Sequence, residues 1–275
     1  MKLNRLSRGI LLASAILAGS YMPADADTIR LDPTSLEIGI AAGERQRDLL
    51  TLTNETAETL DLTLGLADWA LSSDGELTLI APGDTETSAA GWVRVSPGFV
   101  TLAPGEQRDI LIDIIAPSDF EKTGARRTAL LASSIAPDTR AGHDHTLRKL
   151  EVASLVYLTG PGAYSEPAIR DVRLSEGRGT ARRIDLVIEN TGSAHARLQG
   201  SIEIEGKGRA VILPLASLVV LGKSSRTFSM PVREALPADA RASVTLIDMA
   251  APQSPEGRSA LPRYTAPLTN QASFR

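Results

Sequence analysis

The sequence holds 275 residues, of which 43% are apolar and 23% are charged, and it contains no cysteine. This length suffices for two domains of ordinary size, and the composition is that of a globular chain, which excludes a largely disordered or membrane-embedded protein. Without cysteine, disulfides, thiol catalysis and thiolate metal sites are excluded as well. Aromatic residues make up only 4%, so the predicted core is aliphatic.

The N-terminus has the three parts of an export signal. Three basic residues fall within the first eight positions, Gly9–Ala18 is an apolar run, and Ala24-Asp25-Ala26 supplies small residues for a cleavage site. The apolar run is shorter than the ~20 residues needed to span a membrane. We therefore expect residues 1–26 to be a signal peptide that is cleaved after Ala26, and the mature protein to reside in the periplasm without membrane insertion.

The mature chain is mildly acidic. Residues 1–26 contain three basic and one acidic residue, so 26 basic and 32 acidic residues remain and the net charge becomes −6. Residues of both signs are mixed along the chain. This balance argues against nucleic acid or an anionic membrane surface as the partner.

Residues 27–161 are predicted to form a first domain of short strands separated by turns. The clearest signal is 60–66, where leucine occupies every second position, the pattern of a strand with one buried face. Pro33 interrupts the first strand and donates no hydrogen bond, which suits a sheet edge. Asn54-Glu55-Thr56 has the form of a glycosylation sequon, and we interpret it as a hairpin tip. The expected strands are Ile29–Ile40, Gln46–Asn54, Leu60–Trp69, Glu76–Ile80, three short strands within Gly91–Pro117, Ala125–Ile135 and Leu147–Leu158.

Residues 162–250 are predicted to form a second domain of similar design. Gly160-Pro161-Gly162 marks the boundary and is the expected hinge. About seven short strands follow at the spacing typical of a β-sandwich. They are expected at Ala168–Leu174, 184–188, 198–204, Val211–Leu215, Leu218–Leu221, Arg226–Met230 and Ser243–Ile247. Beyond Ala250, prolines mixed with polar residues predict a flexible tail over 251–275. The predicted fold is therefore all-β, with two tandem immunoglobulin-like β-sandwich domains.

Motifs that carry enzyme chemistry are weak or absent in this sequence. His143-Asp144-His145 brings two imidazoles together, but no third or fourth ligand accompanies them, and we interpret the segment as a solvated loop. Gly222-Lys223-Ser224 resembles the end of a phosphate-binding loop, yet Ser217 stands where that motif requires glycine. No serine lies in a G-x-S-x-G elbow. We expect no enzyme, no cofactor and no metal.

The stretch Gly91–Pro117 carries a resemblance to a known family. It begins with the strand W-V-R-V-S-P, continues with L-A-P-G-E, and ends in a strand with isoleucine at alternate positions before a proline. This stretch resembles the N-terminal domain of PapD-like periplasmic pilus chaperones. The likeness extends more weakly over Ile29–Pro161, including the opening L-D-P-T-S-L-E-I and Ala125–Pro137 with its paired Arg126-Arg127. The resemblance implies a chaperone of exported pilus-like or surface-fibre subunits.

In the resembled family the last strand of this domain is exposed, and its alternating apolar side chains complete a partner subunit by β-strand addition. That strand corresponds here to Leu147–Leu158. The resemblance thus implies partner binding through Leu147, Leu150, Val152, Ser154 and Val156. The same alternation is equally compatible with a strand whose apolar face is covered within its own domain.

One feature of the resembled family is missing. Its members share a basic pair, an arginine in the first strand and a lysine near the end of the last strand, which grips the carboxylate at a subunit's C-terminus. Pro33 stands where the arginine is expected, and Leu155–Leu158 contains no lysine. Arg30 and Lys149 lie nearby but out of register. We therefore expect a client to be anchored differently, or without carboxylate capture.

Two functions from different classes remain. The first is a periplasmic chaperone of exported, pilus-like subunits that acts by strand donation. The alternative is a non-enzymatic envelope scaffold or adhesion protein built of immunoglobulin-like domains. A free edge on the Leu147–Leu158 strand favours the chaperone, and an edge covered by the chain itself favours the scaffold.

Overall fold

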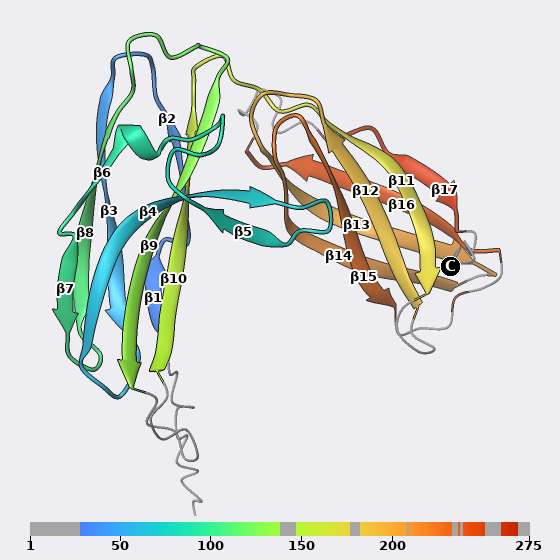
Figure 1. Ribbon diagram of the computed structural model, residues 1–275. Coiled ribbons are helices and arrows are strands. Elements are labelled where there is room, and N and C mark those ends of the chain that lie inside the picture. Colours follow the sequence, from blue (N-terminus) through green and yellow to red (C-terminus); the bar gives the residue numbers. More distant parts are fainter. Residues whose placement is uncertain are drawn as a thin grey trace, which may run out of the picture.

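The computed structural model describes residues 28–137, 147–176, 182–207, 209–232, 236, 239–250 and 260–268. They form two β-sandwich domains that meet at an angle (Figure 1), so the predicted all-β fold with two tandem sandwiches is confirmed. One turn of 3-10 helix at Ala90–Trp92 interrupts the strands, and no helix in the described residues is long and apolar enough to cross a membrane. The expected signal peptide, residues 1–26, lies outside the described residues.

The N-terminal domain consists of two sheets packed face to face. One sheet has the strand order β1-β3-β8-β6, and the other has the order β2-β10-β9-β4-β5, with β7 paired to the start of β4. The strands are β1 (Ile29–Asp32), β2 (Ser35–Gly39), β3 (Arg45–Asn54), β4 (Leu60–Leu71), β5 (Leu77–Ile80), β6 (Val93–Ser96), β7 (Phe99–Leu102), β8 (Gln107–Ile115), β9 (Ala125–Pro137) and β10 (Leu147–Thr159).

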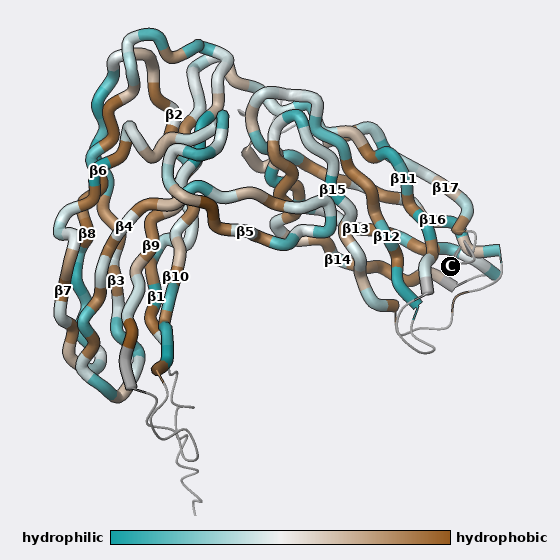
Figure 2. Tube along the Cα trace, in the orientation of Figure 1, coloured by the Kyte–Doolittle hydropathy of each residue, from teal (hydrophilic) through white to brown (hydrophobic). Residues whose placement is uncertain are grey.

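The core between these sheets is aliphatic, as the composition predicts. Leu50 and Leu52 of β3 are fully buried, and so are the three alternating isoleucines of β8, Ile110, Ile112 and Ile114. Apolar and polar segments alternate along the strands in Figure 2. Burial of one such side chain contributes about 1.5–3 kcal/mol. The buried faces of the strands therefore hold the two sheets together in a chain that has no disulfide.

The first expected strand, Ile29–Ile40, is divided between the two sheets. β1 pairs antiparallel with β3, whereas β2 pairs in parallel with β10. The change of sheet falls at Pro33 and Thr34, because proline has no N–H to continue a ladder. As a consequence, β2 covers only one end of β10.

The C-terminal domain contains the sheets β11-β12-β15 and β14-β13-β16-β17. The strands are β11 (Pro167–Glu176), β12 (Arg182–Asn190), β13 (Ala196–Gly206), β14 (Arg209–Val220), β15 (Ser224–Val232), β16 (Arg241–Asp248) and β17 (Tyr264–Pro267). β14 is a single strand, where the sequence predicts two. Its pairing with β13 shifts between Leu198 and Gly200, and Ser217 nearby has a φ of 55°. Such a bulge breaks the apolar period without ending the strand.

Part of the expected C-terminal tail is folded. Tyr264–Pro267 pair antiparallel with β16, and Leu268 is buried. The prediction of a flexible tail over 251–275 is therefore wrong for this segment. Leu261 and Tyr264 pack against the domain core. Because they stand among prolines and polar residues, the sequence shows no apolar period that would predict this packing.

A buried asparagine closes the end of a strand in each domain. Asn54 ends β3 and donates from Nδ2 to the carbonyl of Leu102 at 3.0 Å, while Asn190 ends β12 and donates in the same way to the carbonyl of Val220 at 3.2 Å. Both side chains are fully buried, so the sequon at Asn54 offers no accessible amide. Because β3 and β4 belong to different sheets, the turn after Asn54 connects the sheets and is not the predicted hairpin tip.

Candidate functional site

The strand predicted to bind a partner has one margin that is only partly covered. β10 pairs with β9 along its whole length, but β2 covers the other margin only over Leu155–Thr159. Among the described strands, none pairs with that margin between Leu147 and Ser154. β1 runs close to it and pairs with β3 instead. We call the side of Leu147–Ala153 that faces away from β9 the open margin.

The covered part of the strand begins with two hydrogen bonds. The N–H of Leu155 donates to the carbonyl of Thr34 at 3.0 Å, and Ser154 Oγ donates to the carbonyl of Pro33 at 2.7 Å. Both acceptors lie where the chain passes from β1 to β2. The change of sheet at Pro33 therefore also sets where the open margin ends.

The backbone of the open margin is directed outward from the sheet edge. The N–H of Leu155 points away from β9 to reach Thr34, and backbone groups alternate in direction along an antiparallel strand. The N–H and C=O groups of Lys149, Glu151 and Ala153 therefore point to the same side. An unpaired row of this kind is a template for another strand.

Four of the five predicted partner-binding side chains point into their own domain. Ser154 and Val156 are fully buried, and Leu150 and Val152 are partly buried against the N-terminal core. Leu147 is 73% exposed and, by alternation, lies on the opposite face. The four inward-facing side chains therefore contribute to the stability of this domain. Contact of these residues with a partner remains a prediction.

A second exposed apolar residue, which no pattern in the sequence revealed, lies beside Leu147. Ile135 of β9 is 68% exposed and stands opposite Lys149, so it shares the outward face of the sheet with Leu147. Lys149 Nζ and the carboxylate of Glu151 form an ion pair at 2.6 Å on the same face. In the sequence, Ile135 is surrounded by alanine and serine, which give no apolar period by which to assign its face.

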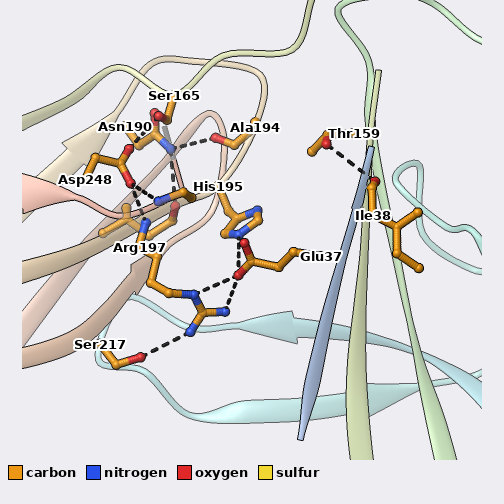
Figure 3. A network of polar contacts seen from close by, with 12 residues as sticks. Glu37, Ile38, Thr159, Ser165, Asn190, Ala194, His195, Arg197, Ser217 and Asp248 are labelled. Carbon is orange, nitrogen blue, oxygen red and sulfur yellow. Dashed lines mark hydrogen bonds and ion pairs between the residues drawn. The ribbon is translucent and has the colours of Figure 1, made fainter. Parts of the chain in front are cut away.

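Polar contacts with the second domain hold β2 in place (Figure 3). The carboxylate of Glu37 on β2 accepts a hydrogen bond from Arg197 Nε at 2.7 Å and lies 3.3 Å from His195 Nε2. The neighbouring imidazole of His195, with a smaller contribution from Arg197, lowers the pKa of Glu37 to about 2, although partial burial opposes this shift. The ring of His195 packs on Tyr157 of β10 with 4.1 Å between centroids. The strand that limits the open margin is thus fastened to the C-terminal domain.

A cavity of about 180 Å³ lies between the domains at the C-terminal end of β10. Arg126 and Arg127 of β9 line it together with Lys223, and Glu121 contributes a carboxylate. The guanidinium of Arg127 lies 5.2 Å from the ring centroid of Trp69 and donates from Nε to the Trp69 carbonyl, and burial lowers its pKa. Within the described residues neither arginine forms an ion pair with a carboxylate. Partly buried cations that form no direct ion pair favour an anionic group in this cavity.

Of the two weak motifs in the sequence, one lies in the described residues. Gly222-Lys223-Ser224 lies at the turn between β14 and β15, which is not the strand-to-helix setting of a phosphate-binding loop. His143-Asp144-His145 lies outside the described residues. Across the part of the chain that the structure describes, no three histidine, aspartate or glutamate side chains are grouped to hold a metal ion.

No protein-family profile matches the sequence, and no curated protein matches it. Several solved structures are similar to this chain. The class 5 fimbriae chaperone CfaA is 12% identical, with 88% of this chain and 99% of that chain covered and a TM-score of 0.46. A chain of the CsuC–CsuE chaperone–tip adhesion subunit complex from Csu pili of Acinetobacter baumannii is 13% identical, with 89% and 100% covered and a TM-score of 0.46. A chain of the complex between SafA pilin and the SafB chaperone of Salmonella enterica is 13% identical, with 87% and 96% covered and a TM-score of 0.46.

Proposed function

We propose that this protein is a periplasmic chaperone of exported, pilus-like or surface-fibre subunits, which it binds by β-strand addition at the open margin of β10. The observation that carries the proposal is that no described strand pairs with the outer side of Leu147–Ala153, whereas the rest of β10 is paired on both sides. The class of client comes from the sequence resemblance of Gly91–Pro117. The open margin spans about 20 Å, enough to pair with a strand of ordinary length.

The backbone of β10 carries this interaction more than its apolar side chains do. Because Leu150 and Val152 pack against their own core, a client strand gains its affinity from the outward N–H and C=O groups of Lys149, Glu151 and Ala153. On the outward face of this sheet, the large apolar side chains of Leu147 and Ile135 are exposed.

The cavity between the domains supplies an anchor in place of the missing basic pair. Arg126 and Arg127 bind an anionic group of the client, such as a chain-terminal carboxylate, by charge-assisted hydrogen bonds. Tyr157 and Leu158 of β10 also line this cavity. One strand therefore presents the open margin at one end and the anchor at the other.

The test replaces Glu151 with proline or with alanine in the full-length protein. Glu151→Pro removes an N–H that points to the open margin and keeps the ladder to β9, whereas Glu151→Ala removes only the side chain and its ion pair with Lys149. Tagged proteins are recovered from the periplasm of the native host, and their partners are identified by mass spectrometry. We expect the wild type and Glu151→Ala, but not Glu151→Pro, to retain a small strand-rich exported protein.

That partner is then purified, and its affinity is measured for each variant, including Arg127→Gln. We expect Arg127→Gln to weaken binding about tenfold, because a hydrogen bond to a charged group contributes about 1.5–3 kcal/mol. If Glu151→Pro binds as the wild type does, strand addition at this margin is wrong. If all variants recover the same envelope proteins, or none recovers any, the scaffold or adhesion alternative replaces the chaperone.

A further inference from the structure

The segment that joins the domains is packed rather than free. The N–H of Gly160 donates to the carbonyl of Gly124 at 2.9 Å, and the N–H of Gly162 donates to the carbonyl of Lys122 at 2.8 Å. A Cβ at Gly160 would lie 2.2 Å from the Lys122 carbonyl oxygen. Gly160 therefore permits a close approach of two backbones, and the sequence-based expectation of a hinge at Gly160-Pro161-Gly162 overlooks this role.

A hairpin of the N-terminal domain extends to the C-terminal domain. β4 and β5 project from their sheet toward β14 and β15 (Figure 1). At the tip, the carbonyl of Ser73 accepts a hydrogen bond from the N–H of Thr227 on β15 at 2.6 Å. The turn itself is ordered, because the N–H of Glu76 donates to Ser72 Oγ at 2.9 Å. The tip thus makes a backbone hydrogen bond to a strand of the other domain.

Gly75 in this turn is required by its conformation and by its neighbour. Its φ is +92°, and a Cβ there would lie 2.2 Å from Arg226 Nη2. The Arg226 side chain is itself held, because Nη1 donates to the carbonyl of Val219 at 2.7 Å and the guanidinium lies 4.6 Å from the centroid of Phe228. The hairpin tip and β15 therefore fit together closely at this point.

An apolar cluster fills the space between the hairpin and the C-terminal domain. Trp69 of β4 is fully buried, and it meets the edge of Tyr157 at 5.4 Å between centroids and shares the cluster with Leu221 of the second domain. Leu71 and Leu79 of the hairpin pack against the same cluster. A buried tryptophan contributes more apolar area than any other side chain, so this contact resists separation of the domains.

We propose that the β4–β5 hairpin is a brace that fixes the angle between the two domains. Domains joined by a short linker ordinarily move relative to one another unless their interface is large and apolar. Here the hairpin tip, the Trp69 cluster and the Glu37–Arg197 ion pair each join the two domains. A rotation about the linker breaks at least one of them. The cavity between the domains is therefore preformed, and a ligand that enters it does not need to close the domains. The brace does not depend on the proposed function.

The absence of cysteine allows a direct test by site-directed spin labelling. Cysteines introduced at the exposed positions Thr101 and Glu205, one in each domain, carry the labels, and pulsed electron paramagnetic resonance measures the distance distribution between them. We expect a single narrow distribution in the otherwise wild-type chain and a clearly broader one in Gly75→Val. Gly83→Val is the matched control, because Gly83 has a φ of +95° and no atom lies within 4 Å of a Cβ added there. It is expected to keep the narrow distribution.

Arg226→Ala provides a second variant without a change of backbone strain. It removes the surface against which Gly75 packs, and we expect it to broaden the distribution as well. Circular dichroism checks that each variant is folded, and Arg226→Ala decides the question if Gly75→Val does not fold. A broad distribution in the unmodified chain overturns the brace, and so does a narrow distribution in the folded variants of Gly75 and Arg226.

Discussion

Two long strands, β10 in the N-terminal domain and β14 in the C-terminal domain, each have an exposed edge, but the two edges differ in whether their backbone can pair with another strand. Both pair on one side along their length, β10 with β9 and β14 with β13. Among the described strands, β14 has no second neighbour, and β10 has β2 over Leu155–Thr159 only. Exposed apolar side chains do not distinguish the two edges, because each edge carries one: Ile212 of β14 is 64% exposed and Leu147 of β10 is 73% exposed.

The backbone does distinguish the edge of β14 from the edge of β10. β14 contains Pro214, which has no N–H to donate, and Ser217, whose φ of 55° departs from extended geometry. These are devices by which natural sheets blunt an edge against pairing. The open margin of β10 contains no proline or glycine between Leu147 and Ala153. The available backbone, more than the exposed apolar side chains, therefore singles out β10 as a place for strand addition.

The largest expected effect tests whether β10 is open on one side only. Val152→Pro removes an N–H directed at β9 and leaves a carbonyl of the ladder unpaired, so we expect it to lower the free energy of unfolding by about 1–3 kcal/mol. Glu151→Pro changes the opposite side, and we expect a loss of less than about 1 kcal/mol. Urea unfolding followed by circular dichroism measures both. Equal losses in the two variants contradict an open margin.

An intermediate effect tests whether β14 is protected by its proline. Pro214→Thr restores an N–H and a good strand former, and we expect the protein to associate with itself as concentration rises, because the edge then offers a continuous row of backbone groups. Light scattering coupled to size-exclusion chromatography measures the mass. Pro262→Ala, which lies outside the strands, is the control. A Pro214→Thr protein that stays as monodisperse as this control shows that another feature blunts β14.

The smallest expected effect concerns the strand that covers the end of β10. The pKa of Glu37 is lowered to about 2, so the charged carboxylate favours the folded state; this stability is present at neutral pH and is lost as pH falls from about 4 toward 2. Because the side chain is 37% exposed, solvent screening limits the loss to about 1 kcal/mol. Urea midpoints at pH 7 and pH 3 for the wild type and Glu37→Gln measure it. If the urea midpoint of Glu37→Gln falls between pH 7 and pH 3 by as much as that of the wild type, the acid sensitivity comes from other groups and the prediction is wrong.

Much of the fold follows from the sequence because short-range patterns determine it. The alternating leucines of β4 and isoleucines of β8 predict strands with one buried face, and the Pro-Gly turns at 97–98 and 104–105 correctly separate β6, β7 and β8. A period of two is a local property of the backbone, since successive side chains point to opposite faces. The number of domains and the all-β class follow from the same spacing of strands and turns.

Only the tertiary structure decides what covers each face and each edge. The alternation of Leu150, Val152, Ser154 and Val156 is the same whether their face meets a partner or their own core, and packing within the N-terminal sandwich places them in the core. The division of the first strand at Pro33, the pairing of β17 with β16 and the packing of Gly160 against Lys122 depend on residues distant in the chain. The sequence by itself therefore determined most of the strands, and it determined the buried face wherever apolar residues alternate. Long-range pairing decided which margin stays open and how firmly the two domains are joined, because a contact between segments far apart in the chain leaves no local period in either segment.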